Sequence, residues 1–219
     1  MKAFTLVELL VVLAIIATLA ALLFPVFAQA KSAAQSTAGL SNINQMGKGV
    51  QLYLMDFDDE YPLAAYATSN TKFVMWFELV DPYIKNKDVW FCPGSRVSRI
   101  DGSGKSSSHW GYNFSYLTNF MLDFSNADSH MAVSASDIDD PAGTVILTAA
   151  RSSKSTSWCG DDGKLLLPPS LPDSDCFGRP DLVALETTPI CWADGHASRL
   201  RLGAFYYSQV PPDRAFDLQ

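Results

Sequence analysis

The first part of the chain is a long run of apolar residues. Between Leu9 and Phe24 the only polar side chain is Thr18. With the apolar residues on either side, the run covers about 25 residues, whereas a membrane-spanning helix needs about 20. Because lipid cannot hydrogen-bond to an exposed backbone, such a segment must be helical. The pattern therefore predicts a membrane-spanning helix over residues 4–30.

One carboxylate, Glu8, interrupts the apolar run near its start. A charge in lipid is costly, although the positive end of the helix dipole favours a carboxylate at this position. A secretory signal peptide has an apolar core of about 7–15 residues, which is shorter than this run, and Glu8 does not fit its basic start. A plain membrane anchor accounts for the length but not for the acid. A third interpretation is that the charge is used, beside a cation.

Beyond Ala28 the sequence becomes polar but keeps apolar residues at steps of three and four. They form one stripe of an amphipathic helix, made up of Ile43, Met46, Val50, Tyr53 and Phe57. Three glycines weaken this helix, and we interpret them as sites of close packing against a sheet: Gly39, Gly47 and Gly49. Pro62 disfavours helix at the preceding residue. We therefore predict one helix that begins at Phe4 and ends near Asp56–Pro62, and its second half forms the spine of a domain.

Short β-branched or aromatic runs follow, each bounded by Gly, Pro or Asp. We predict strands at Val89–Phe91, Tyr112–Tyr116, Thr144–Ala149 and Ile190–Ala193. Asp194-Gly195 is a two-residue hairpin signal, and Phe73–Ile84 is predicted to be a short helix. Together these elements predict an α+β fold, in which a small antiparallel β-sheet packs on the second half of the long helix. The globular domain would comprise residues 31–219.

The composition narrows the classes of function. The 219 residues carry a formal net charge of -7, with a pI of about 4.8, and they contain no basic stripe, so no nucleic-acid partner is expected. The sequence has no G-x-S-x-G nucleophile elbow. We therefore interpret His196 as a residue that orders the hairpin or packs against Trp192, and Cys92, which precedes a proline, as structural. We expect neither an enzyme nor a cofactor.

Four cysteines, none of them in a C-x-x-C pair, argue against a zinc or thioredoxin-like site. An even number in a domain carried across a membrane suggests disulfides, although four cysteines allow three pairings. We expect Cys159–Cys176 to close a loop and Cys92–Cys191 to tie strands together. The alternative is four buried free thiols.

Carboxylates gather in the glycine- and proline-containing loops of the C-terminal half. Oxygen-rich loops can bind Ca²⁺, and the weak candidates for this chain are Asp161, Asp162, Asp173 and Asp175. Their spacing fits no EF-hand. The alternative is that they are solvated turn residues, so no metal site is assigned.

The segment FTLVELLVVLAIIATLAALLFPVFAQA resembles the N-terminus of type IV pilins and of the pseudopilins of type II secretion systems. The resemblance implies that a prepilin peptidase removes the leader remnant, residues 1–3, by cutting between Ala3 and Phe4, and that Phe4 is then N-methylated. It also implies that Glu8 faces the N-terminal ammonium of a neighbouring subunit. Pro25 matches the family's helix proline, which marks a kink or a locally melted stretch, and proline removes a helical hydrogen bond there.

The resemblance continues along the chain, at lower strength. LSNINQMGKGVQLYLMDFDDEYP, LVDPYIKNKDVWFCPGSR and ICWADGHASRL are similar to segments of a bacterial pilin-like subfamily with a C-terminal Asp-Gly-His hairpin. That subfamily is often named for a histidine ten residues before the Asp-Gly pair, and this chain has Ala184 there.

The resemblance implies a filament subunit that assembles with copies of itself. It also implies a single-pass protein of the bacterial inner membrane, with membrane lipid around its helix, its C-terminal domain in the periplasm and its filament periplasmic or at the surface. Its partners would be the prepilin peptidase, an inner-membrane platform protein and an assembly ATPase. Major pilin, minor pilin and secretion pseudopilin remain open. The alternative is a membrane-anchored extracytoplasmic binding module, an adhesin or a sensor, that does not polymerise.

Overall fold

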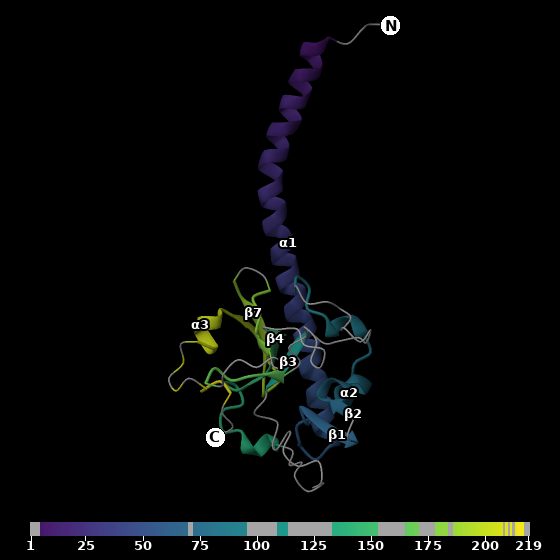
Figure 1. Cartoon of the computed structure of the whole chain (residues 1–219), viewed down its shortest axis with the longest axis vertical. Helices are drawn as coiled ribbons and strands as arrows, with labels where there is room; N and C mark the ends of the chain where they lie inside the picture. Colours follow the sequence, from purple (N-terminus) through teal and green to yellow (C-terminus); the bar gives the residue numbers. More distant parts are fainter. Residues whose placement is uncertain are drawn as a thin grey trace.

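One long helix is the main element of the structure. The computed structural model describes residues 5–69, 72–95, 109–113, 133–152, 165–170, 178–183, 186–207, 209, 211 and 213–216. Helix α1 (Leu6–Asp56) has 51 residues, which corresponds to about 77 Å at 1.5 Å per residue. Its first half projects from the molecule and its second half enters the domain (Figure 1). The predicted helix is confirmed, and it ends at Asp56, the first residue of the predicted range Asp56–Pro62.

The second half of α1 presents its apolar stripe to the domain. Ile43, Met46 and Val50 are fully buried, and Tyr53 is nearly so. The prediction was wrong for Phe57, whose side chain is 48% exposed. Because the helix ends at Asp56, Phe57 adopts φ -126° and ψ 48° and leaves the helical phase, so its ring stacks on Tyr53 with centroids 4.2 Å apart.

Six strands of the described chain form one sheet, and two more form a separate hairpin. The sheet comprises β3 (Trp110–Asn113), β4 (Val145–Ser152), β5 (Leu165–Leu166), β6 (Gly178–Pro180), β7 (Thr188–Trp192) and β8 (Ala197–Leu200). Its order is β3-β5-β6-β4-β7-β8, and β3 also pairs with β4. The hairpin consists of β1 (Ala65–Ser69) and β2 (Lys72–Met75), which pair antiparallel. The α+β architecture is thus as predicted.

The sheet is mixed rather than purely antiparallel, because the short β5 pairs parallel with both β3 and β6. The strands predicted at Thr144–Ala149 and Ile190–Ala193 correspond to β4 and β7. The strand predicted at Tyr112–Tyr116 corresponds to β3, which starts two residues earlier, and residues 114–132 lie outside the described part.

Two predictions of local structure were wrong. The segment predicted as a strand at Val89–Phe91 is instead the 3-10 helix η2 (Lys87–Trp90). The Asn86 side chain accepts a hydrogen bond from the Asp88 backbone N–H at 3.0 Å, which favours the turn over an extended chain. The segment predicted as a helix over Phe73–Ile84 contains the end of β2, then α2 (Trp76–Val80) and the 3-10 helix η1 (Asp81–Tyr83).

Both faces of the sheet are covered, so the domain has three layers. On one face the main core fills the space between α1 and the sheet, and it includes Trp76, Trp110, Tyr112 and Leu147. On the other face Val145, Ile190 and Trp192 pack against the C-terminal segment. That segment contains α3 (Leu202–Phe205) and contributes Phe205, Tyr206 and Phe216. A further 3-10 helix, η5 (Ala135–Asp137), lies beside the end of α1, where Glu60 and Ser134 form a β-bridge.

Candidate membrane and assembly segment

The first half of α1 is an apolar surface that none of the described residues covers. Every residue from Thr5 to Thr18 is exposed, and Leu22, Phe24 and Phe27 expose 71%, 71% and 65% of their surface. In the described part of the chain, α1 is the one helix long and apolar enough to cross a membrane. Residues 6–27 alone measure about 33 Å, against about 30 Å of bilayer hydrocarbon. The segment therefore matches a lipid environment in both length and chemistry.

Helix α1 begins with a capping box formed by Thr5 and Glu8. The Thr5 backbone N–H donates to Glu8 Oε2 at 2.9 Å, and the Thr5 hydroxyl donates to the same oxygen at 2.8 Å. In return, the Glu8 backbone N–H donates to Thr5 Oγ1 at 3.3 Å. This reciprocal arrangement satisfies backbone donors that the first turn of a helix leaves without partners. It also holds the Glu8 carboxylate at the very start of the helix.

The capping box leaves part of the Glu8 carboxylate available. Both hydrogen bonds from Thr5 fall on Oε2, and Oε1 has no partner among the residues that the structure describes. Glu8 is exposed, so a group from outside the chain can reach Oε1. A carboxylate oxygen at the edge of an apolar helix is a strong acceptor for a cation such as an ammonium.

Pro25 lies inside α1, and the helix continues on both sides of it. Proline has no N–H, so the carbonyl of Ala21 loses its intrahelical donor. The chain is nonetheless helical throughout Leu6–Asp56, so the locally melted stretch is not found, and the helix curves gently along its exposed half (Figure 1).

Side chains of α1 fasten the helix to the domain at three levels. Ser36 Oγ accepts a hydrogen bond from Arg199 on β8 at 2.7 Å. Asn42 Nδ2 donates to the Phe91 carbonyl at 3.0 Å, and Gln51 Nε2 donates to the Ala193 carbonyl at 3.1 Å. The first level is at residue 36, so the helix before it stands clear of these attachments.

The predicted hairpin at Asp194-Gly195 joins β7 to β8. The Gly195 N–H donates to the Trp192 carbonyl at 2.9 Å, and the Trp192 N–H donates to the His196 carbonyl at 3.0 Å. The loop therefore has three residues, 193–195, and not the two that were predicted, and Gly195 supplies its left-handed position with φ +86°. His196 stacks on Trp192, with ring centroids 5.6 Å apart, and its Nδ1 contacts Asp194 Oδ1. The interpretation of His196 as a residue that orders the hairpin is confirmed.

Cys92 and Cys191 are buried free thiols, so the disulfide predicted between them is not formed. Each sulfur lies against a glycine of α1, Cys92 at Gly39 and Cys191 at Gly47. Eight residues separate these glycines, which places the thiols at levels about 12 Å apart along the helix, whereas the Cα atoms of a disulfide lie within about 7 Å. Burial, with a smaller effect of Asp181, raises the pKa of Cys92 to about 12, and burial with Asp194 does the same for Cys191.

Several residues singled out from the sequence lie outside the described part of the chain. They are Ala3 and Phe4 of the cleavage site, the calcium candidates Asp161, Asp162, Asp173 and Asp175, the pair Cys159 and Cys176, and Ala184. Within the described residues, no three His, Cys, Asp or Glu side chains come together in a way that could hold a metal ion.

Sequence reasoning missed two contacts of this segment. The capping role of Thr5 could have been found, because Ser or Thr followed three residues later by Glu is the capping-box signature. The bond between Ser36 and Arg199 joins residues 163 positions apart, and no local pattern indicates it.

The comparisons with known proteins agree with this geometry. The family model described as the prokaryotic N-terminal methylation motif matches residues 1–24. No curated protein and no solved structure matches the chain. The motif and the long apolar helix together support a type IV pilin-like protein that is anchored in a membrane. More particularly, the motif supports a pilin or pseudopilin precursor that a prepilin peptidase processes.

Proposed function

We propose that the chain is a structural subunit of a type IV pilus-like or type II secretion pseudopilus filament. In this proposal the peptidase cuts between Ala3 and Phe4, and Phe4 becomes N-methylated. The first half of α1 then leaves the lipid and packs against the same segment of other copies. The observation that carries the proposal is the methylation motif, residues 1–24, at the start of an apolar helix that the protein leaves uncovered.

The apolar surface of the exposed half of α1 needs an apolar environment both before assembly and in the filament. Its apolar surface is unfavourable in water, and lipid supplies cover before assembly. In a filament, the equivalent helices of neighbouring copies supply it. The change exchanges one apolar environment for another, so the segment itself can move from lipid to filament without contact with water.

Glu8 then gives the filament its register. After cleavage the Phe4 ammonium of one subunit would pair with Glu8 Oε1 of another, while Thr5 continues to hold Oε2. A charge pair at low dielectric is strong only when its geometry is good, so a subunit that is displaced along the bundle loses this contact. The apolar residues hold the subunits together, and the charge pair fixes the position of each subunit along the bundle.

The remaining partners and the orientation follow from the resemblance. The Met1 end would face the cytoplasm, where the prepilin peptidase, the platform protein and the assembly ATPase act. The globular domain would lie in the periplasm of a cell with an inner membrane, until assembly carries it into a periplasmic or surface filament.

The mass of the mature chain tests the proposal. The protein is purified from its native membrane, and its intact mass and N-terminal fragments are measured. A chain that begins with N-methylated Phe4 supports processing as proposed. A chain that still begins at Met1 contradicts it and favours the alternative, a membrane-anchored adhesin or sensor that does not polymerise.

A further inference from the structure

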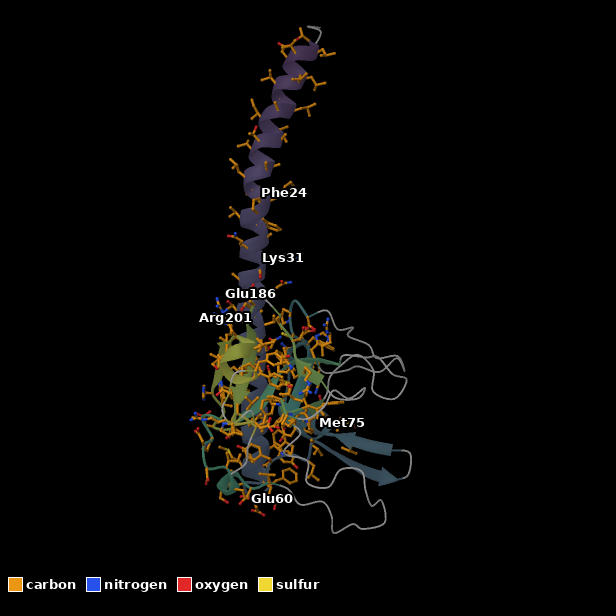
Figure 2. All side chains as sticks on the ribbon, turned by 60° about the vertical axis from the view of Figure 1, so that its left-hand side comes forward. Phe24, Lys31, Glu60, Met75, Glu186 and Arg201 are labelled. Atoms are coloured by element: carbon orange, nitrogen blue, oxygen red, sulfur yellow. The ribbon has the colours of Figure 1, made fainter. Side chains whose placement is uncertain are left out.

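The two ends of the domain along the axis of α1 differ in the charges of their described residues. Figure 2 shows Lys31, Glu186 and Arg201 at the end of the domain from which the apolar helix projects, and Glu60 at the opposite end. The opposite end also carries Asp56, Asp58 and Asp59, which are all exposed. The net charge of -7 therefore does not describe the surface that faces the membrane.

Strand β8 and the residue that follows it carry two arginines toward the membrane. Ala197 pairs with Cys191, which lies against Gly47, whereas Arg199 reaches Ser36. The strand therefore runs toward the N-terminus of α1. Arg201 follows two residues after Arg199, about 7 Å further in that direction.

Lys31 lies at the level that Arg201 approaches. It precedes Ser36 by five residues, or about 7.5 Å of helix. It also follows Phe27, the last large apolar residue of the run, by four residues, or about 6 Å. The headgroup layer on each side of a bilayer is about 5–7 Å thick. With residues 6–27 in the hydrocarbon, Lys31 lies at the outer edge of that layer, and its long stem lets the ammonium reach the phosphates.

The cations at this end are not paired within the described chain. Lys31, Arg199 and Arg201 are exposed, and no described carboxylate lies within ion-pair distance of them. Arg199 donates to Ser36 Oγ, a neutral partner, which holds its guanidinium against α1. Arg151 lies at the same end of β4, a neighbour of β7 in the sheet.

Among the residues that the structure describes, two carboxylates lie toward the same end of the domain as these cations. Glu186 lies at the same end, and half-buried Asp181 lies deeper, near Cys92. Asp56 is 25 residues from Lys31, or about 38 Å along the helix. Charges at that distance are screened, because the Debye length is about 8 Å at physiological ionic strength.

We propose that Lys31 and Arg201 form a membrane-proximal site for the phosphates of anionic phospholipids, which holds the domain against the bilayer before assembly, while Arg199, bonded to Ser36, lies further from the membrane. This inference rests on the proposed function, because it requires residues 6–27 to span a membrane. Arginine binds phosphate through its planar fork and lysine as a point charge. Each cation next to an anionic surface favours binding by about fivefold.

The preference of the protein for phosphatidylglycerol over phosphatidylcholine tests the site. The full chain is reconstituted in phosphatidylcholine bilayers that contain a trace of either lipid with a spin label. Electron spin resonance then measures the fraction of each label immobilised at the protein. We expect the labelled phosphatidylglycerol to be enriched at least about twofold at low salt, within what a single surface cation supplies.

Variants that each remove charge show which residues cause the preference for phosphatidylglycerol. Lys31→Gln/Arg201→Gln keeps the bond between Arg199 and Ser36, and it should bring the preference close to equality. Glu186→Gln removes the opposing charge and should increase it. Lys48→Gln, on an exposed residue of α1 about 25 Å further along the helix, should leave it unchanged.

Three results would overturn the inference. Equal association of the two lipids with the native chain would show that the site does not bind anionic headgroups. Loss of the preference in Lys48→Gln to the same extent as in Lys31→Gln/Arg201→Gln would show a general charge effect. Immobilisation of neither lipid would mean that the chain does not enter the bilayer, and this result alone would also overturn the membrane anchor in the proposed function.

Discussion

Gly47 on α1 lies against the thiol of Cys191 on β7, so closely that a Cβ atom at residue 47 would overlap the sulfur. Gly39 lies eight residues closer to the N-terminus of α1 and faces the thiol of Cys92. A Cβ atom at residue 39 would stand 3.4 Å from that sulfur, which is an ordinary van der Waals contact. Each glycine faces a cysteine thiol, and the two positions differ in the space beside them. They therefore form a matched pair for measuring how tightly the helix is seated on the sheet.

Gly47→Ala should destabilise the domain, and Gly39→Ala should not. Alanine in a helix is favoured over glycine by up to about 1 kcal/mol, and overpacking a filled core costs about 1–3 kcal/mol. At residue 39 the helix gain remains, and at residue 47 the overlap outweighs it. Thermal unfolding of the full chain in detergent, followed by tryptophan fluorescence, measures both.

The cause of the effect at residue 47 can be checked with a second substitution. Cys191→Ala removes the sulfur, so Gly47→Ala should cost less in that background, with a coupling free energy of about 1 kcal/mol. Equal losses in the two backgrounds would place the strain elsewhere.

Glu8→Ala should leave membrane insertion intact and stop filament assembly. The apolar run is unchanged, so the helix still partitions into lipid, whereas the partner of the neighbouring ammonium is lost. Membrane flotation measures insertion, and electron microscopy of sheared filaments measures assembly. Thr18→Ala, which removes an exposed hydroxyl that bonds only within its own helix, is the control and should assemble. Normal filaments from the Glu8→Ala chain would rule out the register role.

The free energy of unfolding should fall with pH between about 9 and about 12, because burial raises the pKa of Cys92 and Cys191 to about 12. Below this window both thiols are neutral in both states. Within it the unfolded chain loses protons that the folded chain keeps, so each thiol contributes a slope of about -1.4 kcal/mol per pH unit. Denaturant unfolding at several pH values measures the slope. Cys191→Ala should make it shallower by one such contribution, and an unchanged slope would contradict the assignment.

Tyr61→Phe should destabilise the domain by about 0.5–1.5 kcal/mol. The Tyr61 hydroxyl donates to the Ala193 carbonyl at 2.8 Å, and Gln51 donates to the same oxygen. Because Gln51 still donates to this carbonyl in Tyr61→Phe, the loss of unfolding free energy should lie near the lower limit. The loss in the double variant Tyr61→Phe/Gln51→Ala should exceed the sum of the losses in the two single variants. Tyr207→Phe is the control, because Tyr207 is 65% exposed and its loss should not register in the same melt.

The features that could be predicted from the sequence are those that depend on neighbours along the chain. A long helix that ends before Pro62 follows from the apolar period and from the proline, and the hairpin follows from Asp194-Gly195. The predicted apolar stripe extended one residue too far, to Phe57, because the periodicity of apolar residues does not mark the residue at which a helix stops. Val89–Phe91 has the composition of a strand, but the Asn86 side chain stabilises a turn there.

The features of the candidate membrane and assembly segment likewise fall into two groups, those that the sequence shows and those that depend on the fold. The apolar run, Glu8 and Pro25 are visible in the sequence because each is unusual in its surroundings. The pairing of Cys92 with Cys191 was wrong because cysteine count carries no distance, and the two thiols contact α1 at different levels. The cationic end of the domain depends on the direction of β8 relative to α1, which only the fold establishes.

The continuity of α1 has a mechanical consequence. The same rod lies in the bilayer at Leu6 and in the core at Met46, without a break. A helix turns by about 100° and advances by 1.5 Å for each residue. A torque on the apolar half is therefore transmitted to the domain, and moving a subunit by one residue position along a helical bundle turns its outer surface by about a quarter of a revolution. In the proposed filament, the charge at Glu8 would therefore select the azimuth of the domain as well as its height.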